Sequence, residues 1–432
     1  MNKVVSAPEI LLPQSLGNGV KYFSQYSNPS REGIGWFGKD LPRIVANKGF
    51  GADSLTWDFV TIALSVSAAD RSISRSKMAD GWTREIELVV HVSSPLLWRG
   101  VTGKFERMLR FLTGDIWHVD FQDGGVNPSR RPRRRNIELF LEKYNHSDCI
   151  ALLSGGVDSL VGCIDLVADG RNPVFISSKV TANCEQQRIF ASQISRNAVH
   201  LQLGSAIQLG DKESENSTRG RSIVFFAFAA LAASAIRHSE DSPVPIFVSE
   251  NGFISLNIAL NPGRIASFST KTTHPVYMRL LSEIWKEVGI SCELILPYKY
   301  KTKGEMIAEC KNSSLFETLA CESTSCSRFG RYARMHCGRC LPCLVRQAAF
   351  AKAGVSDPTI YKFGVGNMRR TQGPDDVGAI AGTCILSHRP DFLSSIMGDF
   401  YFASGEEKRS YIDVYRRGLS ELESQLRATA VI

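Results

Sequence analysis

The stretch that decides the fold is "CIALLSGGVDSLVGCIDL", residues 149–166. An apolar run ends in Ser-Gly-Gly, and an aspartate and a serine follow before apolar residues resume. A buried strand that turns through glycines into a helix leaves backbone N–H groups unpaired at the positive end of the helix dipole. Gly155 and Gly156 permit positive φ angles and let a phosphate approach the backbone closely. The stretch therefore predicts an anion site at the carboxyl end of a strand.

The residues of this turn are the predicted phosphate-binding residues. They are Ser154, Gly155, Gly156, Val157, Asp158 and Ser159. The two serines offer hydroxyl donors, whereas Asp158 would repel a bare phosphate and so indicates a divalent cation such as Mg²⁺ or a helix N-cap. No Gly-Lys-Ser/Thr follows, so the turn is not a Walker loop. An ordinary glycine turn with a serine cap is the alternative, but the complete string after a strand favours a phosphate site.

Charged residues further along the chain are candidates to steady the phosphates. Arg219 and Arg221 precede a long apolar segment, and Lys303 lies in "PYKYKTKGEM", residues 297–306. A lone Arg or Lys is more commonly a solvated surface charge, but the position of these residues after strand-like segments favours function. Glu185 and Asn251 are weaker candidates. The predicted catalytic residues are Asp158, Ser159, Lys303 and Arg221.

Composition restricts the class of protein. The chain has 432 residues, 43% of them hydrophobic, which suffices for a sizeable core and two or three domains. No apolar run reaches the roughly 18 residues of a membrane span. The N-terminus lacks the apolar region of a secretory signal. Eleven cysteines in a chain of this length do not suggest a disulfide framework, so we expect a cytoplasmic protein, without membrane association, that carries one metal site.

Strand-like and helix-like segments alternate after residue 148. The strand-like segments are 149–154, 173–178, 199–204 and 245–251, and the helical ones include 183–197 and 223–236. This order predicts an α/β domain over residues 148–354, with a parallel sheet and helices on both of its faces. Residues 355–432 read as a helical extension.

The first third of the chain differs in pattern. It is rich in Trp and Phe, and residues 85–92 and 116–122 read as strands, so we expect a β-rich α+β accessory domain over residues 1–129. The basic string "RRPRRR" follows at residues 130–135, and residues 130–147 are the predicted linker. An exposed hinge is favoured there over a nucleic-acid contact.

A second pattern, "CSRFGRYARMHCGRCLPC", spans residues 326–343. Four thiolates around one ion suit a closed tetrahedral Zn²⁺ site. An iron–sulfur cluster is the competitor, but ferredoxins place the fourth cysteine three residues downstream, followed by Pro. Cys321 and His336 remain open as alternatives to Cys326 for the fourth ligand. The predicted metal ligands are Cys326, Cys337, Cys340 and Cys343.

Together the two patterns resemble QueC, the 7-cyano-7-deazaguanine synthase family, over roughly residues 148–352, about half of the chain. The Ser-Gly-Gly-Val-Asp-Ser string looks like the PP-loop of ATP pyrophosphatases. Further matching pieces are Glu185, "RGRS" at residues 219–222, Lys303, "STSC" at residues 323–326 and Arg346. The resemblance implies an adenine nucleotide alpha hydrolase-like fold, with ATP, Mg²⁺ and a structural Zn²⁺. It also implies that ATP adenylates 7-carboxy-7-deazaguanine, which ammonia then converts to the nitrile.

The chain also departs from QueC. A Tyr-Pro-Asp-Cys-Arg-Pro string of that family is replaced by "STKTTHPVY", residues 269–277, which puts the final chemistry in doubt. QueC is a compact single domain, whereas this chain adds about 145 residues before the PP-loop and a helical tail after it. That build resembles the QueC-like proteins of bacterial defence operons, most of all QatC of the Qat anti-phage systems. The resemblance implies transfer of the deazaguanine to an amine on a partner protein from the same operon, which the N-terminal domain would dock.

Two other readings remain open beside this one. A tRNA- or DNA-modifying PP-loop enzyme is possible, but the sequence shows no recognised RNA-binding module, and a net charge of +8 is small for a nucleic-acid enzyme. A catalytically dead scaffold has no need to keep both glycines and Asp158. A free nitrile synthase that uses ammonia is the alternative within the family.

Overall fold

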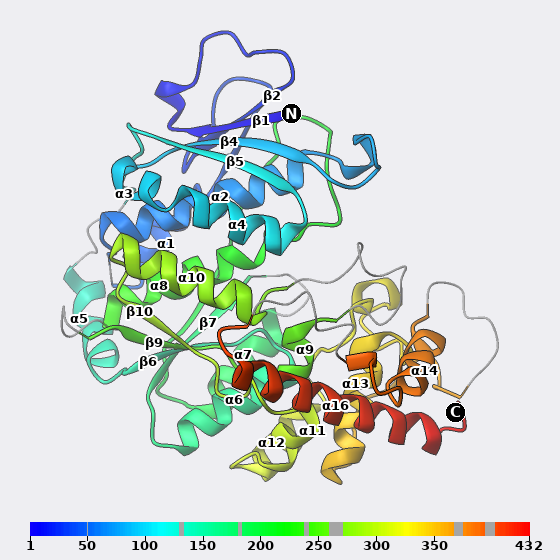
Figure 1. Ribbon diagram of the computed structural model, residues 1–432. Coiled ribbons are helices and arrows are strands. Elements are labelled where there is room, and N and C mark those ends of the chain that lie inside the picture. The colour runs from blue at the N-terminus through cyan, green and yellow to red at the C-terminus, as the bar shows by residue number, and fades with distance from the viewer. Residues whose placement is uncertain are drawn as a thin grey trace.

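Two five-stranded parallel sheets with helices between them form the molecule (Figure 1). The computed structural model describes residues 1–49, 51–128, 134–179, 184–236, 242–258, 271–366, 375–393 and 402–432. The predicted parallel α/β architecture is confirmed for the second half of the chain.

The first sheet, sheet A, has the strand order β3-β2-β1-β4-β5, and every pair in it is parallel. Its strands are β1 (Asn2–Ala7), β2 (Val20–Gln25), β3 (Ile34–Phe37), β4 (Glu85–His91) and β5 (Ile116–Gln122). The predicted strands at 85–92 and 116–122 are therefore confirmed. The prediction of a β-rich α+β domain is wrong, because this region is a parallel α/β unit with long helices. One of them, α2 (Ser54–Ser72), is buried on nearly all sides and so has no polar face to reveal a helical period.

The second sheet, sheet B, has the strand order β10-β9-β6-β7-β8 and is also parallel. Its strands are β6 (Cys149–Leu152), β7 (Pro173–Ser178), β8 (His200–Leu203), β9 (Val244–Phe247) and β10 (Cys292–Ile295). Alternate residues of β6 serve different cores: Ile150 and Leu152 face sheet A, and Ala151 and Leu153 face the opposite side. Sheet B is thus covered on both faces.

One layer of helices lies between the sheets (Figure 1). It includes α2, α4 (Thr102–Thr113), α8 (Ser222–Ile236) and α10 (Pro275–Val288), together with α1 (Leu41–Asn47) and α3 (Pro95–Gly100) at one side. The rings of Phe59 in α2 and Trp285 in α10 meet edge to face, with centroids 5.6 Å apart. One large hydrophobic core therefore joins sheet A to sheet B, and a smaller cluster of Ala7, Leu12, Tyr22 and Ile34 lies apart from it.

The far side of sheet B carries a second layer of helices and a second core. Its members are α6 (Val157–Ala168), α7 (Cys184–Ile194), α11 (Lys303–Ala308) and α12 (Ser313–Ala320). The helical C-terminal region adds α13 (Leu341–Ala353), α14 (Val377–Leu386) and α16 (Gly405–Ala428), which pack with α9 (Gly252–Leu256) around a third core. The helical character predicted for this region is thus found in its described residues.

The predicted linker contains regular structure. Helix α5 (Arg134–Asn145) occupies most of residues 130–147, and the hydroxyl of its buried Tyr144 donates a hydrogen bond to the carbonyl of Lys48 at 2.8 Å. Arg134 and Arg135 are exposed at the start of this helix, and the role of residues 130–147 as a linker stays a prediction. The first arginines of "RRPRRR" lie outside the described residues. The boundaries at 129, 147 and 354 stay predictions.

Candidate functional site

The glycine turn joins β6 to α6 as the sequence predicted. Gly156 is the N-cap residue of α6, and Gly155 has a φ of +96°, a conformation that other residues rarely adopt. The backbone N–H of Ser154 donates to Ser159 Oγ at 3.2 Å, and that hydroxyl donates to the Gly156 carbonyl at 3.0 Å. The turn is therefore held closed by its own serines and points the start of α6 outward.

Helix α6 lies unusually close to the end of β9. A Cβ atom at Gly162 would come within 2.0 Å of Ser249 Oγ, so only glycine permits this approach. The close packing brings the first turn of α6 beside the residues that follow β9. Strands β6 and β9 are neighbours in sheet B, and the strand order reverses between them. The ends of these two strands therefore lie side by side at the position where parallel sheets bind ligands.

Asp158 is the centre of the polar contacts at this edge. Its Oδ1 forms an ion pair with Lys303 Nζ, and its Oδ2 accepts hydrogen bonds from Asn251 Nδ2 at 2.7 Å and from Asn251 N at 3.2 Å. Lys303 opens α11 directly after Thr302, whose side chain and that of Glu305 form a capping box. Asn251 is the N-cap of α9. The three side chains are therefore fixed by three separate helix starts.

Glu250 and Thr273 line the same cavity beside Asp158. The Thr273 hydroxyl donates to the carboxylate of Glu250. Loss of solvent raises the pKa of Glu250, and the negative charge of Asp158 adds to this rise, whereas the Thr273 hydrogen bond and Lys303 oppose it. Two carboxylates thus border the same cavity.

A cavity of about 1250 Å³ opens at this edge of sheet B. Its lining includes all residues of the predicted turn except Gly155, together with Lys303 and Glu250. The remaining wall combines two aromatic rings from α8 with polar residues near the cysteine cluster: Phe225, Phe226, Thr324, Ser325, Arg328 and Arg331. The cavity therefore offers an apolar wall opposite a polar, phosphate-sized turn.

The structure does not bring every predicted residue to this cavity. Arg221 is exposed just before α8, and Glu185 is exposed in the first turn of α7, where it pairs with Arg188 at 3.1 Å. The guanidinium of Arg219 lies over the ring of Trp82, 4.7 Å from its centroid, next to the first sheet's helices. None of the three lines the cavity. Their roles in the reaction stay predictions.

Arg346 acts on the cavity from behind its wall. The side chain is fully buried and donates to Ser323 Oγ at 2.6 Å, to Ser325 Oγ at 3.4 Å and to the Ala320 carbonyl at 2.9 Å. Its Nε pairs with Asp357 at 3.2 Å. These bonds fix the loop whose residue Thr324 donates to the carbonyl of Gly155 at 2.9 Å. Arg346 is therefore a positioning residue for the turn.

The four predicted metal ligands come together in one buried cluster. The Sγ atoms of Cys326, Cys337, Cys340 and Cys343 all lie within 4.8 Å of one another. Cys321 is exposed, and the Nε2 of His336 accepts a hydrogen bond from Ser325 N at 3.1 Å, so the structure favours Cys326 as the fourth ligand over both alternatives. Four convergent sulfurs fit a tetrahedral ion.

The bend between the cysteines depends on one glycine. Gly338 has a φ of +83°, and a Cβ atom there would meet the Phe363 carbonyl at 2.1 Å. The backbone N–H of Cys337 donates to Cys326 Sγ at 3.3 Å, and that of Cys340 donates to Cys337 Sγ at 3.3 Å. Because Leu341, Pro342 and Val345 of α13 line the cavity, the cluster also fixes one of its walls.

Sequence reasoning gave too little weight to Glu250 and Asn251. Both directly follow a strand, which is the position at which parallel sheets present functional side chains. This signal was visible in "PIFVSEN", residues 245–251, where polar residues end an apolar run. Thr273 offered no comparable signal: it lies in "STKTTHPVY", residues 269–277, which drew attention only as a departure from the QueC pattern.

Comparisons with known proteins point in the same direction as the motifs. Over 69 residues the chain is 36% identical to the 7-cyano-7-deazaguanine synthase of Paracoccus denitrificans, which covers 16% of this chain and 27% of that protein. It is 39% identical over 72 residues to the synthase of Rhizobium etli strain CIAT 652, covering 17% and 28%. For the synthase of Brucella anthropi the identity is 30% over 102 residues, covering 23% and 37%.

The chain is a distant, partial relative of these synthases. The matches span little more than a quarter to a third of the relatives' own length. They support a QueC-like relationship for that portion. No protein-family model matches the chain, and no solved structure matches it. Among the helices that the structure describes, none is both long enough and apolar enough to cross a bilayer.

Proposed function

We propose that the protein is a QueC-like enzyme that uses ATP, releasing AMP and pyrophosphate, to adenylate the carboxylate of a 7-carboxy-7-deazaguanine-type substrate and to transfer it to an amine. One observation carries this proposal. Asp158, held by Lys303 and Asn251, stands at the N-terminus of α6 beside the glycine turn and faces a cavity of about 1250 Å³. A phosphate chain fits such a turn because backbone N–H groups and the helix dipole both favour negative charge.

The chemistry needs two displacements. A carboxylate oxygen of the substrate attacks the α-phosphorus of ATP, and the bond to the bridging oxygen breaks to release pyrophosphate. The amine nitrogen then attacks the acyl carbon, loses a proton, and AMP leaves with the bonding electrons. Lys303 would offset the charge that grows on pyrophosphate, and Ser154 and Ser159 would donate to phosphate oxygens. Phe225 and Phe226 would contact a flat base.

Two metal ions belong to the proposal. Asp158 and Glu250 supply the oxygen ligands that Mg²⁺ prefers. Burial, with a contribution from the charge of Asp158, raises the pKa of Glu250, and a divalent cation would oppose both effects. When bound, Mg²⁺ would neutralise the phosphates. The four-cysteine cluster would hold Zn²⁺ and stabilise the loop between α12 and α13. A coloured protein that contains iron would instead indicate an iron–sulfur cluster.

The acceptor is proposed to be an amine on a partner protein encoded in the same bacterial anti-phage defence operon. The resemblance to QatC supports this, and so does the size of the cavity. At about 1250 Å³ it exceeds the roughly 300–1,000 Å³ of a pocket for a single small ligand, as a site that takes more than one reactant requires. The N-terminal region would dock the partner, and the enzyme would act in the cytoplasm.

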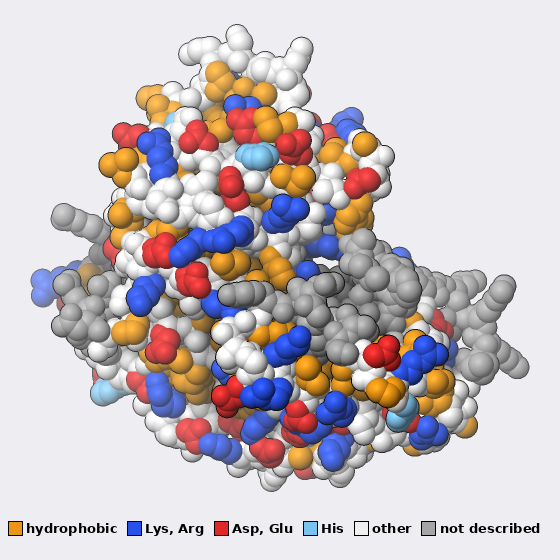
Figure 2. Space-filling model, in the orientation of Figure 1, with side chains coloured by type: hydrophobic (Ala, Val, Ile, Leu, Met, Phe, Trp, Pro, Cys, Tyr) orange, Lys and Arg blue, Asp and Glu red, His pale blue; other side chains and the backbone are white. Residues whose placement is uncertain are grey.

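A nucleic acid is a less favourable acceptor. Figure 2 shows Lys and Arg side chains interspersed with Asp and Glu on the visible face, without one continuous basic area. Phosphate backbones are bound by clustered positive charge, so this face does not favour them. Free nitrile formation from ammonia is the alternative that product analysis separates.

The test is release of AMP and pyrophosphate from ATP that depends on 7-carboxy-7-deazaguanine, followed by mass spectrometry of co-expressed operon proteins. Asp158→Asn should abolish AMP release. Asp165→Asn is its matched control: Asp165 lies on the same helix, accepts from Tyr298 OH at 2.5 Å and from Lys311 N at 2.8 Å, and does not line the cavity. Substantial AMP release by Asp158→Asn, or none by the wild type with any carboxylated deazaguanine, would contradict the proposal.

A further inference from the structure

One segment of the second half of the chain lies along the first sheet. This segment, residues 205–220 between β8 and α8, is here called the strap. Gln208 pairs with Trp36 of the edge strand β3 through N–H to carbonyl bonds of 2.8 and 2.9 Å, and Gly38 N donates to the Ser205 carbonyl at 3.0 Å. A Cβ atom on Gly210 would meet the Gly33 carbonyl at 2.4 Å. The strap therefore lies in backbone contact with sheet A.

Two acidic side chains of the strap fasten it further. Glu213 accepts from Ser74 N at 3.0 Å and pairs with Lys21 and Lys77, each at 3.0 Å. Glu215 accepts from Arg75 N at 2.7 Å. Their partners belong to β2 and to the turn after α2, which is η2 (Arg75–Lys77). The first sheet thus supplies the cations and N–H donors, and the strap supplies the carboxylates.

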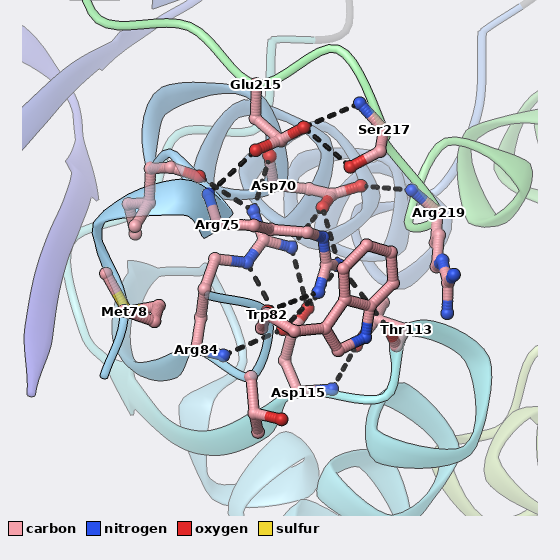
Figure 3. Close-up of polar contacts among 12 residues, drawn as sticks. Asp70, Arg75, Met78, Trp82, Arg84, Thr113, Asp115, Glu215, Ser217 and Arg219 are labelled. Atoms are coloured by element: carbon pink, nitrogen blue, oxygen red, sulfur yellow. Dashed lines mark hydrogen bonds and ion pairs between the residues drawn. The ribbon is translucent and has the colours of Figure 1, made fainter. Parts of the chain in front are cut away.

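The strongest attachment is at the end of the strap (Figure 3). Asp70, fully buried in the last turn of α2, accepts from Arg84 Nη2 at 2.5 Å with one oxygen. Its other oxygen accepts from both Arg219 N and Gly220 N at 2.7 Å. Arg84 also pairs with buried Asp115 at 2.6 Å. A buried carboxylate with this many donors is costly to disturb, because the N–H groups that it accepts from would lose a buried acceptor.

The strap leads directly to the proposed nucleotide cavity. Helix α8 begins at Ser222, two residues after Gly220, and its first two turns supply the cavity residues Phe225 and Phe226. The side of α8 packs on α2 in the common core, and the strap fixes the residues just before its first turn. The start of α8 is therefore held by two sets of contacts. A shift of the strap would therefore move the aromatic wall of the cavity.

We propose that Asp70 is a positioning residue: through the strap it sets the start of α8, so that the N-terminal region is an integral part of the nucleotide site and not a removable docking module. The proposal deepens the proposed function, because it treats the cavity as the place where ATP binds. It assigns the first sheet a role in the reaction that does not depend on a partner protein.

The test compares Asp70→Asn with Asp58→Asn. Both aspartates lie on α2, and both are buried, but Asp58 accepts from Ser93 and Ser94 within the first sheet's own unit. An asparagine at residue 70 has one acceptor oxygen and cannot serve both Arg84 and the strap amides. Asp70→Asn should speed hydrogen exchange of Arg219 and Gly220 about tenfold. It should also raise KM for ATP severalfold with a smaller effect on kcat.

Asp58→Asn should leave both readouts near wild type. Equal strap exchange in the two variants would overturn the role of Asp70. If Asp70→Asn does not fold, Glu215→Gln takes its place and should speed strap exchange about threefold, and an unchanged rate would overturn the proposal. Failure of the proposed function looks different: the wild type would release no AMP, while the strap amides of Asp70→Asn would still exchange faster.

Discussion

The two sheets end differently at their carboxyl edges. In sheet A the carboxylate of Asp58 fills the turn after β4, accepting from Ser93 N at 2.8 Å, Ser94 N at 3.0 Å and Trp98 Nε1 at 3.2 Å. In sheet B the turn after β6 keeps its carboxylate, Asp158, at the side of an open cavity. Both are five-stranded and parallel, so architecture alone does not create a site. In sheet A the turn's N–H groups donate to a carboxylate, whereas in sheet B those of Ser154 and Gly156 donate to the hydroxyls of Ser159 and Ser154, so these two donors hold no carboxylate.

The carboxyl edge of sheet B, with its cavity, is here called the open edge, and that of sheet A the closed edge. The largest effect should come from the cysteine cluster, which fixes a wall of the cavity at the open edge and has no counterpart in the described part of sheet A. Cys340→Ser should lose the metal and expose residues 326–366 to proteolysis, because structural Zn²⁺ binding contributes directly to folding free energy. Wild-type protein should hold about one zinc per chain by elemental analysis. Iron with labile sulfide, or a fully folded, metal-free Cys340→Ser, would show that the cluster is not a structural zinc site.

The next largest effect, on the rate of AMP release, should come from removing the positive charge of Lys303 at the open edge. Lys303→Met keeps the length of the side chain and removes the charge that pairs with Asp158. We expect kcat for AMP release to fall roughly 10²–10³-fold, as for loss of one electrostatic donor. Lys301→Met, an exposed neighbour that pairs with Glu309, is the control and should retain activity. Similar rates in the two variants would mean that Lys303 does not face the reacting phosphates.

Weakening the contacts of Asp58 at the closed edge should lower the free energy of unfolding and leave ATP turnover unchanged. Asp58→Asn weakens the contacts to the turn after β4, so the free energy of unfolding should fall by about 1–3 kcal/mol in urea titrations. ATP turnover should stay within about twofold of the wild type, because sheet A offers no nucleotide site. A large loss of turnover at unchanged stability would break the comparison between the edges.

The smallest effect should appear on acidification. Burial raises the pKa of the Glu213 and Glu215 carboxyls. Hydrogen bonds from Ser74, Lys21 and Lys77 outweigh it and lower the pKa of Glu213 to about 2. Hydrogen bonds from Ser217 and Arg75 do the same for the pKa of Glu215, which is also about 2. Since these pKa values lie below the ordinary 4.5, the carboxylates stabilise the fold fully above about pH 4.5, and this stabilisation is lost as the pH falls towards 2.

The measurement is hydrogen exchange of the strap at pH 6 and pH 3, corrected for intrinsic rates. The wild-type strap should open more at the lower pH, whereas Glu213→Gln/Glu215→Gln should already be partly open at pH 6 and change less. An equal response of the two proteins would exclude these carboxylates as the fastening.

Sequence predicted the parts of the molecule that local patterns encode. Four strands of sheet B (β6, β7, β8 and β9), the glycine turn and the four cysteines each lie within short segments whose spacing has one physical explanation, whereas β10 was not predicted. Sequence predicted two strands of sheet A but not its parallel order, because β3 has only four residues and α2 is buried on nearly all sides, so neither period is visible.

The contacts of the site depend on the fold as a whole. Asp158 and Asn251 are 93 residues apart in the sequence, and Asp158 and Lys303 are 145 apart. Asp70 and Gly220 are separated by 150 residues. The sequence gives no reason to pair residues this far apart. The string "RGRS", residues 219–222, was therefore interpreted as part of the catalytic site, whereas the backbone N–H groups of its first two residues donate to Asp70.

The central claim is that the open edge of sheet B binds ATP and the closed edge of sheet A does not. Hydrogen exchange with and without a non-hydrolysable ATP analogue and Mg²⁺ tests this most directly. The account predicts slower exchange at residues 153–160, 249–252 and 302–304, with residues 92–98 after β4 unchanged. Protection at residues 92–98, or no protection around Asp158 at saturating analogue, would contradict it.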